Sequence, residues 1–231
     1  MGVTITLAKL QNKNELAEHL LNLTVPMFIG AIIGSRFWQV FLFDWGYYSK
    51  NLGEIIAIWH GGLSIQGGIV GAVIVGLWYV KKHKISFWEL ADLCAPGLIL
   101  GQSIGRDANL MNGDAFGDPT GGNWGILYPE GTNARATYGD HPLYPAEVWE
   151  GQMDLIIFAL VMMLLQKKLK KGYLFLITNI LYNFGRFLLE MLRGDTPKYM
   201  LGWTTAQWTS VSMFVFCLGA CIYLHFKHST P

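Results

Sequence analysis

Hydrophobic residues occur along this chain in long runs that short polar segments separate. Six runs are each about long enough to cross the ~30 Å hydrocarbon core of a membrane as a helix. They lie near residues 22–43, 61–80, 87–105, 146–166, 172–193 and 206–226. The pattern predicts an all-α, polytopic helical membrane protein with six full transmembrane helices.

The N-terminal stretch MGVTITLAKL is a further apolar segment, and it is too short to span a membrane. We interpret it as the inner end of a partial helix whose preceding half is absent from the sequence. It has no signal-peptide cleavage pattern. We expect a single transmembrane domain over residues 1–231, with an outer-surface head formed by residues 106–145.

Composition supports a membrane location, since 52% of the 231 residues are hydrophobic and only 14% are charged. The basic residues gather in clusters at alternate loops: KKHK (81–84), KKLKK (167–171) and HFKH (225–228). The positive-inside rule places these clusters in the cytoplasm. Residues 44–60, 106–145 and 194–205 then face outward, and nothing in the charge pattern indicates a nucleic-acid partner.

The third apolar run ends in a stretch with concentrated polar chemistry. Arg106, Asn109 and Asn112 follow at i, i+3 and i+6, so on a continuing helix they share an arc of roughly 120°. Side chains on one arc can hold one ligand. The Asn112–Gly113 step predicts the end of the helix, and Asp114 follows in a surface loop.

Glycines precede this polar stretch at regular spacing. Gly97, Gly101 and Gly105 recur every four residues, which predicts close packing against a neighbouring helix.

Polar residues in the fifth run fall at i, i+4, i+8 and i+11, which predicts one helix face: Tyr182, Arg186, Glu190 and Arg193. Arg186 lies about 22 Å from the cytoplasmic end of its run and therefore inside the hydrocarbon. A charge at such depth normally faces the bundle interior, is paired and marks a substrate path. Glu190 is the expected partner. Arg106 lies at a similar depth, and two arginines suit a phosphate group.

Structural interpretations of the same residues stay open. Arg193 follows the span and is also explained by snorkelling to the membrane surface. The pair Arg186 and Glu190 is also explained as an ion pair that locks two helices.

Four ordered motifs with consistent spacing resemble the prolipoprotein diacylglyceryl transferase family: WHGGLSIQGGIVGA (59–72), GRDANLMNGDAFG (105–117), YPAEVWEG (144–151) and NFGRFLLEMLRGD (183–195). The resemblance covers about residues 24–226. It implies a seven-helix enzyme of the bacterial inner membrane whose active site faces the outer leaflet. It also implies transfer of the diacylglyceryl group of phosphatidylglycerol to the lipobox cysteine in the signal peptide of a preprolipoprotein. A thioether forms and glycerol phosphate leaves.

By this resemblance, Arg106 binds the phosphate, Asn109 and Asn112 bind headgroup oxygens, and Arg186 is a second essential arginine held by Glu190. Asp114 stands where the family usually has glutamate. The catalytic candidates are Arg106, Arg186, Glu190, His60 and Gln66. The substrate-binding candidates are Arg106, Asn109, Asn112, Asp114, Gly117 and Arg193.

Two positions depart from the family pattern. Gln66 stands where many members have His or Tyr, and an amide cannot accept a proton at neutral pH. His60 is a candidate substitute, although beside Trp59 it is equally explained as an interfacial hydrogen-bonding residue. Tyr144 stands where members often have His, with His141 close by in sequence.

No cofactor or metal is implied, because the acidic residues do not cluster with the histidines at ligand spacing. The expected partners are phosphatidylglycerol, the preprolipoprotein and membrane lipid. Two alternatives stay open: a catalytically inactive relative that binds lipid, and a membrane transporter in which Arg186 and Glu190 line a polar path. A transporter of that kind predicts inverted repeats, which the apolar runs do not contain.

Overall fold

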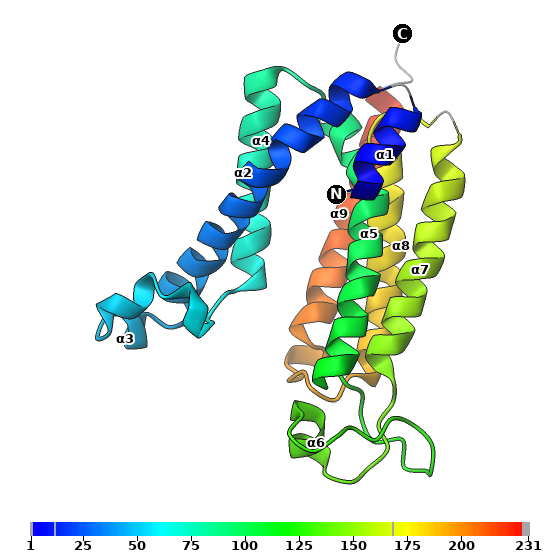
Figure 1. The fold of residues 1–231 in the computed structure, drawn as a ribbon. Coiled ribbons are helices and arrows are strands. Elements are labelled where there is room, and N and C mark those ends of the chain that lie inside the picture. Colours follow the sequence, from blue (N-terminus) through cyan, green and yellow to red (C-terminus); the bar gives the residue numbers. More distant parts are fainter. Residues whose placement is uncertain (1, 12, 168, 228–231) are drawn as a thin grey trace. The chain divides into compact units, whose positions relative to one another are not determined.

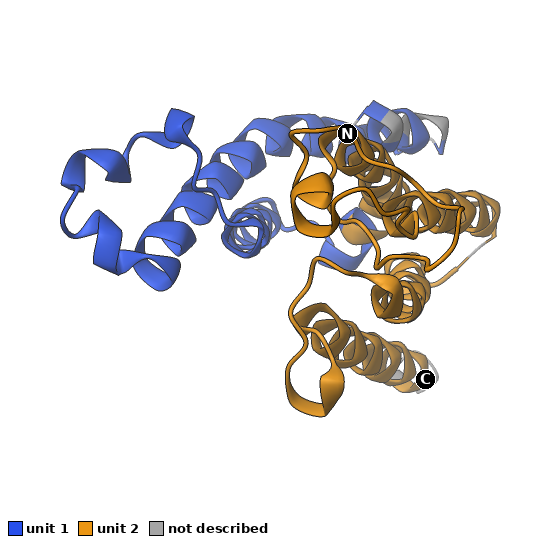
Figure 2. Ribbon diagram, turned by 90° about the horizontal axis from the view of Figure 1, so that it is seen from below, with its two compact units in different colours: residues 1–90 blue, residues 91–231 orange. Residues whose placement is uncertain are grey.

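The computed structural model describes residues 2–11, 13–167 and 169–227, so Lys168 and His228 of the basic clusters lie outside the described residues. Within this part of the chain the regular elements are helices, and strand pairing is limited to isolated bridges. The all-α prediction is therefore confirmed. The chain divides into two compact units, Met1–Leu90 and Ala91–Pro231, which Figure 2 colours separately. The single-domain expectation stays a prediction.

The first unit is built around two long helices that pack against each other, α2 and α4 (Figure 1). Its elements are α1 (Gly2–Leu10), α2 (Asn14–Trp38), a π-helix (Gln39–Phe43), α3 (Trp45–Tyr48), 3-10 turns at Leu52–Ile55 and Ile58–His60, and α4 (Ile65–His83). A short helix, α1, lies at the N-terminal stretch, and its being part of a longer helix stays a prediction. The run expected from residue 61 begins its helix only at Ile65, because Gly61 and Gly62 adopt positive φ in the preceding loop.

Glycines allow α2 and α4 to approach backbone to backbone. A Cβ atom at Gly34 would clash with the carbonyl oxygen of Gly67, and one at Gly71 would clash with that of Gly30. Small residues at such a crossing permit the close contact that drives helix association in lipid. The stripe expected at Gly97, Gly101 and Gly105 does not play this part within the second unit, since open space lies beside Gly101 and Gly105 there.

Arg36 organises the irregular segment between α2 and α4. Its guanidinium donates to the carbonyls of Ile55 at 2.9 Å, Gly61 at 2.6 Å and Gly62 at 2.7 Å. It also donates to the carbonyls of Glu54 and Ala57, and it lies over the ring of Tyr48. Arg36 is buried, so these neutral partners satisfy its hydrogen-bonding groups and shape residues 44–62 around it.

The second unit is a bundle of α5, α7, α8 and α9 with a head of loops and α6 at one end (Figure 1). Its elements are α5 (Phe87–Asn112, which begins in the first unit), α6 (Asn133–Tyr138), α7 (Ala146–Leu165), α8 (Tyr173–Leu189), 3-10 turns at Glu190–Leu192 and Met200–Gly202, and α9 (Thr205–Lys227). The Asp92 carboxylate on α5 accepts the backbone N–H groups of Gly172 at 2.6 Å and Phe175 at 2.8 Å. This contact satisfies donors at the start of α8.

α5 continues to Asn112 and ends at Gly113, where φ is +69°, so the first residues of the expected outer-surface segment 106–145 are helical, and its outer location stays a prediction. The helix end itself falls where the Asn–Gly step predicted it. The head has its own small apolar core, formed by Phe116, Tyr128, Ala134 and Leu143.

Three helices of the described chain are long and apolar enough to cross a membrane: Asn14–Phe43, Ala146–Leu165 and Thr205–Phe226. They match three of the six predicted spans. The other three predicted spans form the helices α4, α5 and α8. α4 ends in a basic cluster, α5 carries four charged side chains, and α8 has only 17 residues. The structure thus establishes helices in all six places and does not establish six crossings.

Candidate functional site

One face of α7 carries buried carboxyl groups within an otherwise apolar helix. Glu147, Glu150 and Asp154 follow at i, i+3 and i+7, and each has an exposed fraction of 0%. Ile157 and Val161 continue the same face into the apolar core that α7 shares with α5 and α8. The carboxyl groups therefore point into the bundle and away from lipid.

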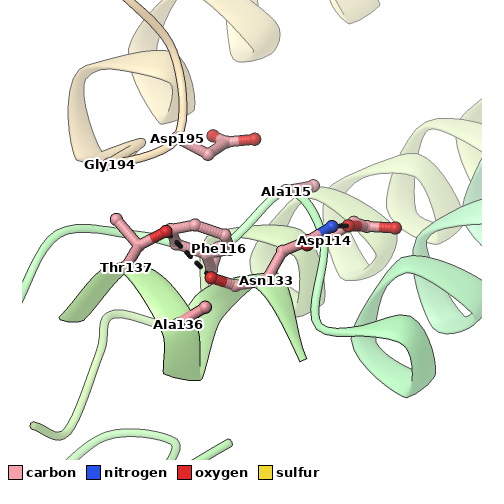
Figure 3. Close-up of a pocket in the computed structure, with 8 residues that line it drawn as sticks. All are labelled: Asp114, Ala115, Phe116, Asn133, Ala136, Thr137, Gly194 and Asp195. Carbon is pink, nitrogen blue, oxygen red and sulfur yellow. Dashed lines mark hydrogen bonds between the residues drawn. The ribbon is translucent and has the colours of Figure 1, made fainter. Parts of the chain in front are cut away.

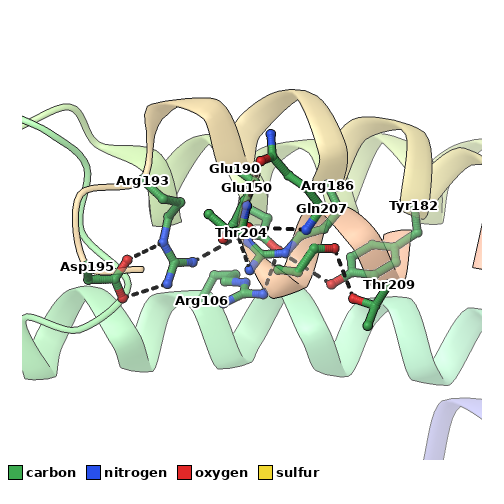
Figure 4. A network of polar contacts seen from close by, with 11 residues as sticks. Arg106, Glu150, Tyr182, Arg186, Glu190, Arg193, Asp195, Thr204, Gln207 and Thr209 are labelled. Carbon is green, nitrogen blue, oxygen red and sulfur yellow. Dashed lines mark hydrogen bonds and ion pairs between the residues drawn. The ribbon is translucent and has the colours of Figure 1, made fainter. Parts of the chain in front are cut away.

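Glu150 is the centre of the polar cluster in Figure 4. Its Oε1 accepts from Arg106 Nη2 on α5 at 2.5 Å, and its Oε2 accepts from Arg186 Nη1 on α8 at 2.5 Å. The Tyr182 hydroxyl lies 3.5 Å from Oε1. One carboxylate on α7 thus joins two arginines from two other helices, and the predicted approach of Arg106 to Arg186 is confirmed.

Arg186 also pairs with Glu190, at the start of the 3-10 turn that follows α8, as the sequence predicts. Its Nη2 lies 2.7 Å from Oε2 of Glu190. Oε1 of Glu190 accepts from the hydroxyl of Thr204 at 2.9 Å, and the Glu190 side chain is fully buried. Glu190 therefore fixes Nη2 of the Arg186 guanidinium while Glu150 holds Nη1.

Arg193 belongs to the same cluster but does not lie on α8. The helix ends at Leu189, a 3-10 turn follows, and Arg193 itself is extended, so the prediction of one continuous helix face through residue 193 is wrong. Its Nε and Nη2 donate to the two carboxylate oxygens of Asp195 at 2.6 and 2.7 Å. Its Nη1 lies 3.9 Å from Glu150 Oε2. Arg193 is buried in a paired state, which excludes snorkelling.

The cluster offers fixed positive charge in a largely dry site. The side chains of Arg106 and Arg186 are 18% and 13% exposed, so both are mostly buried yet accessible to a ligand from one side. Guanidinium groups bind carboxylate and phosphate with the same two-pronged geometry. An incoming phosphate can therefore exchange with Glu150. In the described part of the chain, no group of three His, Cys, Asp or Glu side chains is arranged to hold a metal ion.

A polar pocket of about 480 Å³ opens in the head (Figure 3). The carboxyl groups of Asp114 and Asp195 line it together with Asn133 and Thr137. Asn133 donates to Asp114 at 2.7 Å, which fixes that carboxylate at the wall. Asp195 also pairs with Arg193, so the pocket and the arginine cluster share one ion pair.

Tyr138 ties the head to the segment that follows α8. Its hydroxyl donates to Asp118 at 2.9 Å and lies 3.2 Å from the carbonyl of Gly194. Burial, and then the hydrogen bond to the Asp118 carboxylate, raise the pKa of the Tyr138 phenol. The phenol therefore keeps its proton and its bond to Asp118 well into the alkaline range.

Comparison with known proteins gives a consistent result. The family model of prolipoprotein diacylglyceryl transferase matches residues 1–223. The chain belongs to this family. Figure 4 accordingly draws the arginine cluster of a family member, and the resemblance read from the four sequence motifs is confirmed.

Relatives with substantial identity carry the name phosphatidylglycerol–prolipoprotein diacylglyceryl transferase. A protein of Acaryochloris marina is 39% identical over 187 residues, which is 80% of this chain and 67% of that protein. A protein of Listeria welshimeri is 36% identical over 219 residues, or 94% of this chain and 77% of that protein. A Nostoc protein is 38% identical over 210 residues, or 87% of this chain and 72% of that protein.

The remaining family positions of the second unit lie near the cluster in different environments. Asn109 is half-buried and Asn112 is exposed at the end of α5. Gly117 is buried, and a Cβ atom there would lie 2.5 Å from the Tyr144 carbonyl and 2.9 Å from that of Leu192. Only glycine fits this position, which holds the head loop beside the segment carrying Arg193. Substrate contacts of Asn109, Asn112 and Gly117 stay predictions.

The candidates of the first unit lie on its irregular segment and at the start of α4. His60 is exposed, and its Nδ1 lies 2.9 Å from Oε2 of Glu54. Gln66 is exposed, and its side-chain oxygen accepts from the hydroxyl of Ser64 at 2.7 Å. Both side chains are accessible, and their catalytic roles stay predictions.

Four buried residues of the structure were not predicted from the sequence: Glu147, Glu150, Asp154 and Arg36. For the carboxyl groups a signal was present, because acidic residues at helical spacing inside an apolar run are a functional indicator. For Arg36 the signal was its charge inside the apolar run 22–43, although its backbone partners could not be read from the sequence.

Proposed function

We propose that this protein transfers the diacylglyceryl group of phosphatidylglycerol to the cysteine thiol of a prolipoprotein. Family membership and the names of the relatives support the reaction. The observation that carries the proposal is the convergence of Arg106 and Arg186 on Glu150. These arginines provide two buried, two-pronged anion binders where the reaction needs them.

The chemistry follows from the charges. The thiol sulfur attacks the terminal glyceryl carbon of the diacylglyceryl group, the carbon–oxygen bond to phosphate breaks, and the thiol loses its proton. The leaving glycerol phosphate gains negative charge as this bond breaks. Preorganised arginines in a site of low dielectric stabilise that charge more in the transition state than in the bound lipid.

The membrane arrangement is part of the proposal. Helices at all six predicted places cross the bacterial inner membrane, with α1 as a partial seventh, and the head lies on the outer surface. The lipid enters the cluster from the outer leaflet. The second substrate is a signal peptide whose lipobox cysteine reaches the site from the same side, and no cofactor takes part.

The substrate-facing residues outside the cluster complete the assignment. Asn109, Asn112 and Asp114 bind headgroup oxygens, and Gln66 orients a reacting group, with His60 as the candidate base. Gln66→Ala is expected to weaken transfer, whereas Gln66→His is expected to preserve it. Loss of activity in Gln66→His would argue against the orienting role.

The test is release of glycerol phosphate by the purified full chain in detergent, from phosphatidylglycerol and a lipobox peptide. Release is expected to require the peptide cysteine and to fall sharply in Arg106→Ala. Arg135→Ala is the matched control, because Arg135 pairs with the exposed Asp140 in the head. Full activity in Arg106→Ala would overturn the assignment of the phosphate site.

Two other outcomes would identify the alternatives. Binding of phosphatidylglycerol without any release would identify an inactive lipid-binding relative. Solute flux through reconstituted vesicles, lost in Arg186→Ala, would identify a transporter.

A further inference from the structure

Asp154 is a buried carboxyl group to which the proposed reaction assigns no task. It lies on α7 one turn after Glu150, and its exposed fraction is 0%. Within the described part of the chain, neither of its carboxyl oxygens has a hydrogen-bond partner. Such a group requires an explanation, because buried polar atoms are almost always satisfied.

The charged and titratable groups that face Asp154 come from each of the neighbouring helices. They are Glu150 on its own helix, Arg106 on α5, and Arg186 and Tyr182 on α8. Ile157, about one turn further along α7, belongs to the apolar core with Ile99 and Val161. Asp154 thus occupies the boundary between the arginine cluster and the dry interior of the bundle.

The cations near Asp154 already have partners. Arg106 pairs with Glu150, Arg186 with Glu150 and Glu190, and Arg193 with Asp195. These three arginines are matched by three carboxylates, and Glu147 adds another buried carboxyl group next to them. A further negative charge on Asp154 would be uncompensated in a low dielectric, so the neutral, protonated form is the stable one.

The phosphate of an anionic lipid changes this balance. A phosphate that takes the place of the Glu150 oxygens on Arg106 and Arg186 leaves the Glu150 carboxylate buried and without its cations. That state is strongly unfavourable unless Glu150 gains a proton or a hydrogen-bond donor. Asp154 lies one turn away at i+4 on the same helix face and interacts electrostatically with Glu150, whereas Glu147 on the other side accepts from the Tyr128 hydroxyl.

We propose that Asp154 holds a proton in the resting protein and shares it with Glu150 when a phosphodiester takes over Arg106 and Arg186. The proton moves between two carboxyl groups, no bond in the lipid changes, and the total charge of the site changes only by that of the bound anion. Asp154 is a positioning residue, since it acts through Glu150. The proposal rests on the proposed phosphate site and adds that anion binding there is coupled to a proton.

The direction of the pH dependence follows from this coupling. A phosphodiester keeps its single negative charge from about pH 6 to about pH 9. At low pH the proton is present, and the anion binds tightly. Once Asp154 has lost its proton, binding must take one up from solvent, so the dissociation constant rises by up to about tenfold per pH unit.

The experiment measures binding of phosphatidylglycerol to the full chain in detergent micelles across this pH range, with diacylglycerol as the probe that lacks phosphate. The wild-type protein is expected to bind phosphatidylglycerol more weakly as pH rises, and to bind diacylglycerol equally at every pH. Asp154→Asn has a side-chain amide that can donate to Glu150 but has no proton to lose, so it is expected to bind phosphatidylglycerol near the tight low-pH value of the wild type, with no slope. Asp154→Glu, which restores a carboxyl group, is expected to restore the slope.

Glu147→Gln is the matched control, because it neutralises another buried carboxyl group on the same face and is expected to keep the slope. Asp154→Thr is a second neutral variant and serves if Asp154→Asn does not fold. A wild type without a slope, or a neutral Asp154 variant that keeps the full slope, would overturn the proposal. Failure of the proposed function would be seen separately, as absent glycerol phosphate release by the wild type at every pH.

Discussion

The buried arginines of the two units have different kinds of partner, which are neutral in the first unit and negatively charged in the second. In the first unit Arg36 donates only to neutral backbone carbonyls, and in the second unit Arg106 and Arg186 share one carboxylate. A carbonyl belongs to the main chain, so Arg36 cannot change partner unless the segment it holds unfolds. A carboxylate can be exchanged for another anion of similar shape. We infer that Arg36 serves the fold, whereas Arg106 and Arg186 serve a ligand.

The two units also differ in the contacts that hold their own helices together. Backbone atoms make the key contacts of the first unit, both around Arg36 and at the glycine crossing of α2 and α4. In the second unit, side chains join α5, α7 and α8 in the arginine cluster, as Figure 4 shows. Substitutions that separate these two kinds of contact test the comparison directly.

The largest effect is expected for Arg186→Ala. Loss of one preorganised cation from the phosphate site should lower the initial rate of glycerol phosphate release by about 100-fold to 1,000-fold. Arg135→Ala should leave that rate within about twofold of the wild type, because its partner Asp140 is exposed. Similar rates in Arg186→Ala and Arg135→Ala would mean that the cluster is purely structural.

Arg36→Met should reduce stability more than any other single change in the first unit. It leaves the carbonyls around Arg36 without donors, and we expect a loss of about 3 kcal/mol or more in the free energy of unfolding. Thermal unfolding in detergent measures it. Arg36→Lys should recover only part of the loss, because an ammonium has three donors and cannot reach all these carbonyls. Full recovery by lysine would show that charge alone matters there.

Gly71→Ala adds one methyl group at the backbone contact of α2 and α4 and so tests that contact. The new Cβ atom meets the carbonyl of Gly30, so we expect a loss of about 1–3 kcal/mol by the same unfolding measurement. Gly76→Ala on the same helix is the matched control, since no atom lies within 4 Å of its Cβ position. It should be neutral or slightly stabilising. Equal effects of the two substitutions would contradict close packing at Gly71.

The smallest effect is expected for Tyr138→Phe, which removes one side-chain contact between the head and Gly194. The loss should be about 1 kcal/mol at neutral pH. Because the pKa of Tyr138 is raised in the folded protein, its contribution is complete below the pKa of the unfolded chain and is lost as pH rises through the folded pKa. The wild type should therefore lose its advantage over Tyr138→Phe at strongly alkaline pH. A difference that is constant with pH would contradict the bond to Asp118.

Apolar periodicity predicted a helix in every one of the six expected places, because burial in lipid or in a bundle imposes the same pattern on each. The ends of these helices were less predictable. The Asn112–Gly113 step did predict the end of α5, but α4 begins only at Ile65, because Gly61 and Gly62 adopt positive φ within the predicted run. α8 stops before Arg193, although the spacing of charges continues its pattern.

The site was predicted in part for a similar reason. Arg106 and Arg186 stood out because charges deep in apolar runs are rare. Both arginines meet on Glu150 because three helices pack together. The spacing of residues within one helix gives no information about that packing. Arg36 lies in the apolar run 22–43 and carried the same signal, but its partners are backbone carbonyls, which no sequence pattern identifies.

The hydrogen bonds of Asp92 attach α5 to the start of α8 at one end of the bundle. Asp92 on α5 accepts the N–H of Gly172, and 14 residues further along the two helices Arg106 and Arg186 reach the same carboxylate. Fourteen residues correspond to about 21 Å of helix and nearly four turns on both sides. The same number of residues therefore separates the Asp92 contact from the arginine on each helix, which brings both arginines to the same level of the bundle. Inserting one residue between Asp92 and Arg106 would turn that arginine by about 100° and take it away from Glu150, whereas an insertion beyond the site would leave it in place.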